Sequence, residues 1–490
     1  MKKYTIMVLL LLGCFCACHS QTVANFSNHF INQTMRIDYY HVGDQKEEFI
    51  TIDKIYRQGT WAGNPNHLLD TFNLGRYQIK VYEKDSQTLI FSKGFDSYFG
   101  EYKTTTPAAS GIKRTYHETA LIPYPKRKIK FVIEKRDRQN RLHPIFETVI
   151  APRGIEINRE PLSGDVKVFE ILKNGAPHNK VDVAFIAEGY TRAEEGKFKK
   201  RLETAAENFF KIEPYKTNKD KFNIYGVFKP SQESGCDEPG HGIYRNTAVH
   251  SSFNALGSPR YLLTEGNKEL RDIAAHAPYD TLLIMVNSKR YGGGGLYNSF
   301  CVFTAGSTHQ QYLLVHEFGH SFTGLADEYY SSSVAYNEFY PRGIEPLEAN
   351  ITALLDPAEI KWKHLLSKGI EIPTKWKKTV YEKKSMQYQV TRRKLNKEIA
   401  RLKRRGGPEE EIAKLKEEAE RRSRENIQQT GAFLNKSSLS GKVGAFEGAG
   451  YTAKGLYRPM LNCIMFSRGI QPYCKVCRAA VARVIEFYTD

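Results

Sequence analysis

The first third of the chain is a series of short apolar runs separated by polar turns, with no long helical pattern. Residues 48–52, 77–82 and 128–133 each have the length and composition of a strand. Many short strands at such spacing are typical of a β-sandwich. We therefore predict an all-β sandwich over residues 21–152. No group of catalytic residues stands out there, so we interpret it as an accessory or binding domain.

Further along, the pattern changes to strands that alternate with helices. Residues 181–186, 222–228 and 281–286 are apolar runs of strand length. After the first run, Thr191 and Glu194 have the spacing of a capping box at a helix start. This alternation predicts an α/β domain with a mixed sheet. The predicted helix carries its apolar residues on one face: Phe198, Leu202, Ala205, Ala206, Phe209 and Phe210.

Four consecutive glycines at residues 292–295 interrupt this domain. They lack the Gly-Lys-Ser/Thr ending of a phosphate-binding loop. We therefore expect a flexible loop that leads into a strand at residues 300–303.

Residues 388–425 are almost entirely Lys, Arg, Glu and aliphatic. A helix stop and restart at residues 405–409 separates two narrow apolar stripes. We predict two antiparallel helices, inserted at about residues 385–427 into a second domain that spans residues 153–490, and we interpret them as a solvated arm. The stripes are Leu395, Ile399 and Leu402, then Ile412, Leu415 and Ala419.

The net charge of +18 suggests an acidic partner, but its distribution weakens that interpretation. Residues 375–425 contain 18 Lys and Arg against 9 Asp and Glu, so this stretch supplies +9, half of the total. Charge runs on helices are usually solvated faces. We therefore expect no nucleic-acid partner.

The first 20 residues have the pattern of an export signal. Lys2 and Lys3 precede an apolar run, residues 6–12, that is too short to span a bilayer as a helix. Two short stretches that end at Cys14 and Cys18 resemble the lipobox of bacterial lipoproteins, and ordinary cleavage without a lipid is the alternative. We expect an exported protein, secreted or held at the bacterial outer membrane by an N-terminal lipid.

Five cysteines follow the proposed signal, and an oxidising compartment permits disulfides. Cys474 and Cys477 have the spacing of a metal knuckle or a redox pair. A knuckle needs two more ligands at similar spacing, and only Cys463 is near. We therefore expect a disulfide between Cys463 and one of the pair. The other two cysteines are Cys236 and Cys301.

His316, Glu317 and His320 form a His-Glu-x-x-His pattern inside an apolar run. On a helix, residues four apart share a face, so both imidazoles can bind one zinc ion. Glu317 would lie beside the open coordination position, where a carboxylate can act as general base. The alternative is a helix with two ordinary histidines.

The residues after this pattern favour a catalytic zinc. Gly324 can end the helix in a left-handed turn, which returns Asp327 toward a third coordination position. Three protein ligands with one open position define a catalytic zinc, so we predict one zinc per chain. Glu328 competes with Asp327 for the third position. Met465, within residues 462–466, resembles the Met-turn that lies beneath the zinc of metzincin peptidases.

Residues 316–329 as a whole resemble the zinc motif of the immunoglobulin A peptidase family of metallopeptidases. The resemblance covers roughly residues 181–478, and it implies a zincin, metzincin-like peptidase domain behind a β-rich domain. The helical hairpin is not part of the family pattern. Further stretches that resemble the family are residues 185–191, 231–237, 446–451 and 457–459.

These observations predict a zinc endopeptidase that cleaves protein or glycoprotein substrates, with Glu317 as general base. A cell-surface module that binds glycan or protein and has a secondary zinc site is the alternative, but binding alone does not need Glu317. A purely structural zinc site normally has four protein ligands. We expect an extended substrate to pair with the strand formed by Ser299, Phe300, Cys301, Val302, Phe303 and Thr304.

Overall fold

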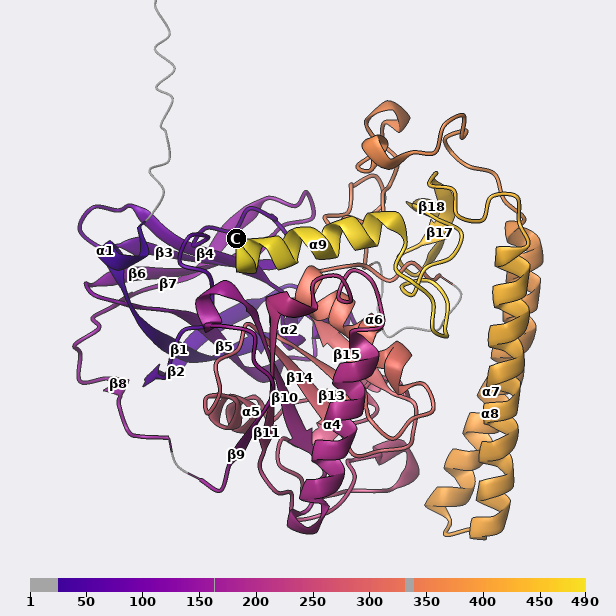
Figure 1. Ribbon diagram of the computed structural model, residues 1–490, viewed down its shortest axis with the longest axis horizontal. Helices are drawn as coiled ribbons and strands as arrows, with labels where there is room; N and C mark the ends of the chain where they lie inside the picture. Colours follow the sequence, from indigo (N-terminus) through magenta and orange to yellow (C-terminus); the bar gives the residue numbers. More distant parts are fainter. Residues whose placement is uncertain (1–24, 163, 331–338) are drawn as a thin grey trace, which may run out of the picture.

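The computed structural model describes residues 25–162, 164–330 and 339–490 (Figure 1). The proposed export signal, with Cys14 and Cys18, lies outside these residues. Within the described part of the chain, no helix is long and apolar enough to cross a membrane.

The N-terminal part contains two four-stranded sheets that enclose a common core, as the sequence predicts. Ile37, Val81 and Phe131 are buried between the sheets. The first sheet, in spatial order, is β5 (Arg114–Pro125), β1 (Phe30–Gly43), β2 (Glu48–Gln58) and β8 (Ile157–Asn158). The second is β4 (Leu89–Phe95), β3 (Tyr77–Glu83), β6 (Ile129–Arg136) and β7 (Leu142–Ile150). The short helices of the N-terminal part are α1 (Phe26–His29), α2 (Tyr98–Tyr102) and α3 (Thr106–Ala109).

The second part is built on a six-stranded mixed sheet, which confirms the predicted α/β character. Its four inner strands are parallel, and both outer strands are antiparallel to their neighbours. The inner strands are apolar throughout because both faces of the sheet are covered. The spatial order is β15 (Gly293–Leu296), β16 (Phe300–Thr304), β14 (Thr281–Val286), β10 (Val181–Glu188), β11 (Phe222–Phe228) and β9 (Lys167–Leu172).

Helices cover both faces of this sheet. The core on one face includes residues of α4 (Glu195–Phe209), α6 (Gln310–Thr323) and α9 (Lys475–Thr489). The core on the other face joins α5 (Asn267–Ala274) to α2 and β5 of the sandwich. The predicted capping box before α4 is confirmed, with the Thr191 amide donating to Glu194 Oε2 at 3.1 Å. The α/β part also contains two two-stranded sheets: β12 (Ser251–Ser252) with β13 (Leu263–Thr264), and β17 (Phe446–Ala449) with β18 (Thr452–Arg458).

Two expectations at one edge of this sheet are wrong. The four-glycine segment is not a loop, because Gly293–Leu296 forms the edge strand β15. The strand Ser299–Thr304 cannot pair with a substrate, because β16 is paired with β14 on one side and β15 on the other. Glycine allows this arrangement: a Cβ on Gly295 would lie 2.6 Å from the Glu317 carbonyl oxygen of α6. A side chain there would therefore push β15 away from the helix.

The basic segment forms two long helices, α7 (Lys378–Arg404) and α8 (Glu409–Asn435), that pack along each other (Figure 1). The expectation of a solvated arm is wrong at both ends. Near the base, Tyr381 and Leu434 join the core that contains α6. At the far end, Lys403 Nζ lies 3.1 Å from Glu238 Oε2, and Arg404 donates to the Gly240 carbonyl. The helices therefore lie against the α/β part.

Candidate active site

Helix α6 carries the His-Glu-x-x-His pattern on a buried face. The helix ends where the sequence predicts, because Gly324 adopts the left-handed conformation with φ 64°. His316 and Glu317 are buried, and the four-residue spacing brings the two imidazoles together, with 3.2 Å between their Nε2 atoms. The local fold thus places the three residues as the sequence predicts.

The backbone fixes which ring nitrogen of each histidine faces the other. His316 Nδ1 lies 3.0 Å from the Ile464 carbonyl oxygen, and His320 Nδ1 lies 2.6 Å from the Leu325 carbonyl oxygen. A carbonyl only accepts, so each Nδ1 carries a proton and donates it. In the neutral rings, each Nε2 is then left with a lone pair. The two lone pairs point toward a common position.

Asp327 brings a third acceptor to that position. Its Oδ1 atom lies 3.1 Å from His316 Nε2 and 3.2 Å from His320 Nε2. Three acceptors facing one another in a buried site are unfavourable without a cation. Tetrahedral zinc with ligands at about 2.1 Å would separate them by about 3.4 Å. The three residues, here called the histidine–aspartate site, therefore fit a single zinc ion.

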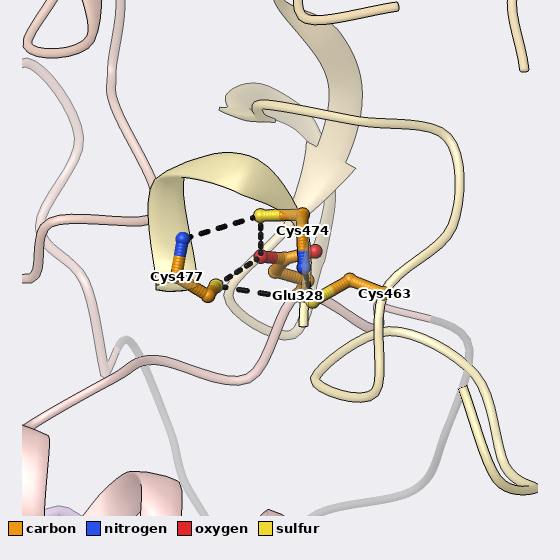
Figure 2. A group of neighbouring side chains, drawn as sticks. All are labelled: Glu328, Cys463, Cys474 and Cys477. Atoms are coloured by element: carbon orange, nitrogen blue, oxygen red, sulfur yellow. Dashed lines mark hydrogen bonds between the residues drawn. The ribbon is translucent and has the colours of Figure 1, made fainter. Parts of the chain in front are cut away.

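Glu328 faces a different part of the molecule. Its Oε1 atom accepts a hydrogen bond from Asn350 Nδ2 at 3.1 Å. The same atom lies 3.2 Å from Cys477 Sγ (Figure 2). Cys463 and Cys474 are the other members of this buried group. The structure thus brings Asp327, and not Glu328, to the two histidines.

The predicted disulfide between Cys463 and the pair is wrong for this structure. Cys463 Sγ lies 3.8 Å from Cys477 Sγ, and the cysteines of this group are all unbonded. A disulfide would require about 2.05 Å.

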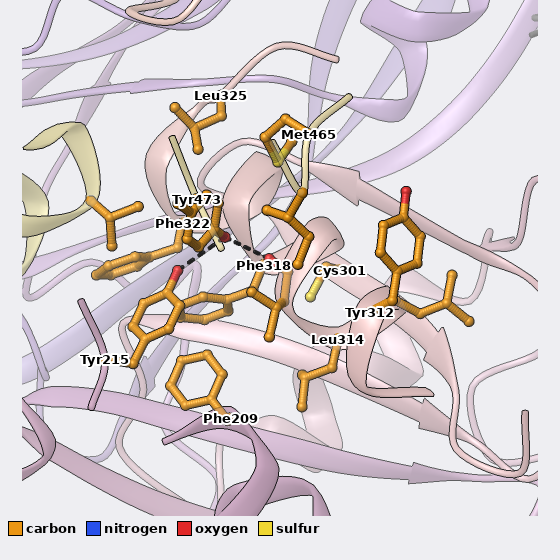
Figure 3. Close-up of a cluster of buried hydrophobic side chains, with 14 of the residues drawn as sticks. Phe209, Tyr215, Cys301, Tyr312, Leu314, Phe318, Phe322, Leu325, Met465 and Tyr473 are labelled. Carbon is orange, nitrogen blue, oxygen red and sulfur yellow. Dashed lines mark hydrogen bonds between the residues drawn. The ribbon is translucent and has the colours of Figure 1, made fainter. Parts of the chain in front are cut away.

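Met465 lies beneath α6, as the Met-turn resemblance implies. Gly319 lies between the two histidines in the chain. A Cβ at this position would lie 3.2 Å from Met465 Sδ, so Met465 packs closely against this turn of the helix. Aromatic residues fill the space around the helix (Figure 3). Tyr473 donates a hydrogen bond to the Val315 carbonyl at 2.6 Å and lies 3.3 Å from the Tyr215 hydroxyl. These contacts fix the position of α6 in the core, and with it the position of both imidazoles.

Glu317 lies beside the histidine–aspartate site, against the glycine strand β15. Its carboxylate lies within 4.8 Å of the ligand atoms of both histidines. A Cβ on Gly293 would lie only 2.6 Å from Glu317 Oε1, so the glycine leaves room for this carboxylate. Burial raises the pKa of Glu317 above its ordinary value. A carboxyl with a raised pKa is suited to accept a proton near neutral pH.

The site opens into a cavity of about 810 Å³. Residues of the sandwich and of the α/β part form its walls. The Tyr451 hydroxyl donates to Asp327 Oδ2 at 2.7 Å, which fixes the orientation of that carboxylate. Arg260 Nη2 donates to the Tyr329 hydroxyl at 3.2 Å on another wall. Arg76 and Arg136 come to this cavity from the sandwich. The sandwich is therefore part of the cavity wall.

Several of these lining residues were not predicted from the sequence. Tyr329 and Tyr451 lie within stretches that carry the family resemblance, so a signal for them was present. Arg260 and Gly293 have no such signal, because their importance follows from contacts with residues that are distant in the chain.

The comparisons with known proteins agree with this architecture. The model of the family described as IgA Peptidase M64 matches residues 169–485, and the model described as Peptidase M64 N-terminus matches residues 25–147. A search of curated proteins finds no match to the chain. The fold therefore consists of an M64 N-terminal domain followed by a peptidase domain. The chain belongs to the IgA peptidase M64 family, which makes it a peptidase.

Proposed function

We propose that the protein is an exported zinc endopeptidase that hydrolyses peptide bonds of host or environmental proteins and glycoproteins. The observation that carries the proposal is the convergence of three acceptors, from His316, His320 and Asp327, within 3.1 to 3.2 Å of one another. Glu317 lies beside them, and a purely structural zinc site would not require it. Membership in a peptidase family supports the same conclusion.

In this proposal the histidine–aspartate site holds one zinc ion. When bound, zinc would polarise the scissile carbonyl and make water more acidic. Glu317 accepts the proton of the attacking water and later delivers it to the leaving amine. Its burial favours both steps, because a raised pKa allows the carboxyl to hold the proton between them.

The residues around Glu317 complete the proposed mechanism. Tyr451 orients Asp327 through the hydrogen bond to Oδ2. Arg260 and Tyr329, joined by a hydrogen bond on the cavity wall, are the candidates to stabilise negative charge on the substrate carbonyl oxygen. They supply the donors that the sequence alone does not identify.

The wider architecture supports a metzincin-like peptidase domain with an inserted hairpin. Met465 lies beneath the helix that carries both histidines, and α7 and α8 lie in the chain between that helix and Met465. The proposed signal at residues 1–20 supports export, with a lipid anchor at Cys14 or Cys18 as the membrane contact. The cavity between two protein domains suits an extended polypeptide substrate.

Incubation of the purified protein with a diverse peptide library tests this function. We expect internal cleavage that a chelator abolishes and that added zinc restores. The His316→Ala/His320→Ala variant, purified in the same way, serves as the control for contaminating peptidases. Cleavage that persists in the chelator, or that is equal in the double variant, would contradict the proposal.

A further inference from the structure

A second group of metal-ligating side chains lies next to the active site and is not used by the proposed mechanism. We call it the cysteine–glutamate cluster: Cys463, Cys474, Cys477 and Glu328 (Figure 2). All four residues are buried, and one ligand atom from each lies within 4.8 Å of the others. The four come from three separate segments of the chain, so the fold itself brings them together.

Three distances within the cluster lie within about 0.4 Å of the edges of a tetrahedral zinc site. Zinc–sulfur bonds of about 2.3 Å place two thiolates about 3.8 Å apart, and a carboxylate oxygen about 3.6 Å from each thiolate. The Sγ atoms of Cys463 and Cys477 are 3.8 Å apart. Glu328 Oε1 lies 3.2 Å from Cys477 Sγ and 3.9 Å from Cys474 Sγ.

Backbone amides donate to two of the three sulfur atoms of the cluster. The Cys474 amide donates to Cys463 Sγ at 3.2 Å, and the Cys477 amide donates to Cys474 Sγ at 3.4 Å. Cys474 is also the N-cap of α9, where the positive end of the helix dipole stabilises negative charge. Buried Arg458 interacts electrostatically with both Glu328 and Cys463, which partly offsets the negative charge of the four ligands.

Glu328 gives an independent indication of a cation. It is fully buried, and its Oε2 atom has no hydrogen-bond partner among the described residues. A buried carboxylate with an unpaired oxygen is costly unless a cation or a proton compensates it. Thiolate ligands select soft cations such as zinc.

We propose that the cysteine–glutamate cluster binds a second zinc ion, with four protein ligands and a structural role. This set lacks the open position of a catalytic site. The two proposed zinc sites share no ligand.

The second zinc would tie together the segments that build the active site. Glu328 directly follows Asp327, and its amide donates to the Met465 carbonyl at 2.8 Å. Cys463 precedes Ile464, whose carbonyl orients the His316 ring. The cluster would therefore hold the Asp327 segment and the Met-turn in one arrangement, as supporting residues do around metal sites.

Metal analysis of the purified full-length protein tests the proposal without measuring activity. We expect about two zinc ions per chain in the parent and about one in the His316→Ala/His320→Ala variant. Cys474→Ser should also contain about one, whereas Cys301→Ser, a buried cysteine outside the cluster, should keep about two. Loss of all zinc in the double histidine variant would overturn the second site and leave the proposed function intact.

The absorption spectrum of the cobalt-loaded protein tests the same site without a cysteine variant, which could fail to fold. Cobalt bound by thiolates gives strong near-ultraviolet charge-transfer bands, which imidazole and carboxylate ligands do not give. We expect these bands in the cobalt-loaded parent and in the His316→Ala/His320→Ala variant. Their absence from both would overturn the proposal. So would peptide mapping that finds Cys463 joined to Cys477 or Cys474 by a disulfide.

Discussion

Asp327 and Glu328 are adjacent carboxylates that face different sites. Asp327 Oδ1 lies 3.1 Å from His316 Nε2, and Glu328 Oε1 lies 3.2 Å from Cys477 Sγ. From the sequence, these two residues were the candidates for the third ligand of the proposed zinc ion beside His316 and His320. The sequence could not separate them, because the choice depends on where the distant segment around Cys463 returns in the fold.

Replacing each carboxylate separately tests this assignment. Asp327→Ala should lose the metal of the histidine–aspartate site and peptide cleavage, because two imidazoles alone bind zinc weakly. Glu328→Ala should keep the metal of that site, although it loses a ligand of the cysteine–glutamate cluster. Thiolate-dependent cobalt absorption, measured beside total metal, shows which site each variant has lost. Retention of both metals by Asp327→Ala would exclude Asp327 as a ligand.

Gly293 permits the position of Glu317. A Cβ there would lie 2.6 Å from Glu317 Oε1 and 2.9 Å from Glu317 Cγ, so the Glu317 side chain would have to move. Gly293→Ala should therefore displace the carboxylate and lower kcat by about 100-fold, with a melting temperature close to the parent's. Gly196→Ala is the matched control, since a Cβ there has no heavy atom within 4 Å. Unchanged kcat in Gly293→Ala would show that Glu317 does not act from this position.

At the scale of elements, apolar runs predicted the inner strands well. Strands β10, β11 and β14 lie where continuous apolar runs occur, because these strands are buried on both faces. Strand β15 escaped prediction because its Gly293, Gly294 and Gly295 carry no side-chain pattern. A pattern of apolar side chains cannot reveal a strand whose contact with the neighbouring helix is made by the backbone of glycines.

The position of the hairpin could not be predicted from the sequence. Its charges suggested solvent exposure, but Lys403 pairs with Glu238, which lies 165 residues earlier in the chain. Such a contact leaves no local pattern. The narrow apolar stripes did predict that the two helices pack on each other.

The Glu238 contact predicts a pH-dependent contribution to stability. Burial raises the pKa of Glu238, but His241, Lys403 and Arg290 outweigh it and lower the value to about 2. The pKa in the unfolded chain is about 4.3. Because the folded value is the lower one, the stabilisation is complete above about pH 4.3 and is lost as the pH falls toward 2.

Denaturant unfolding of Glu238→Gln measures this contribution. We expect the free energy of unfolding to fall by about 2 kcal/mol at pH 7, and the difference from the parent to shrink as the pH falls below about 4. Glu410→Gln changes an exposed residue of α8 and serves as the control. Its free energy of unfolding should equal that of the parent at each pH. A Glu238→Gln variant as stable as the parent at pH 7 would show that the contact does not hold the hairpin.

At the scale of the whole molecule, the two domains build one site together. The sandwich supplies Arg76 and Arg136 to the cavity that contains Glu317. It also shares a hydrophobic core with the peptidase domain, in which Phe99 and Tyr116 join Ile186 and Val286. The sequence indicated two domains but not this shared core. The interpretation of the sandwich as a separate accessory module therefore understates its role.

In the proposed mechanism, Glu317 acts as the base beside a zinc ion held by the histidine–aspartate site. Glu317→Gln preserves the shape of the side chain and removes the group that accepts the proton. Zinc content and peptide turnover should be measured on the same purified sample of this variant. We expect parental zinc content and a turnover lowered by about 1,000-fold or more. Cleavage at the parental rate by the zinc-loaded variant would contradict this role of Glu317.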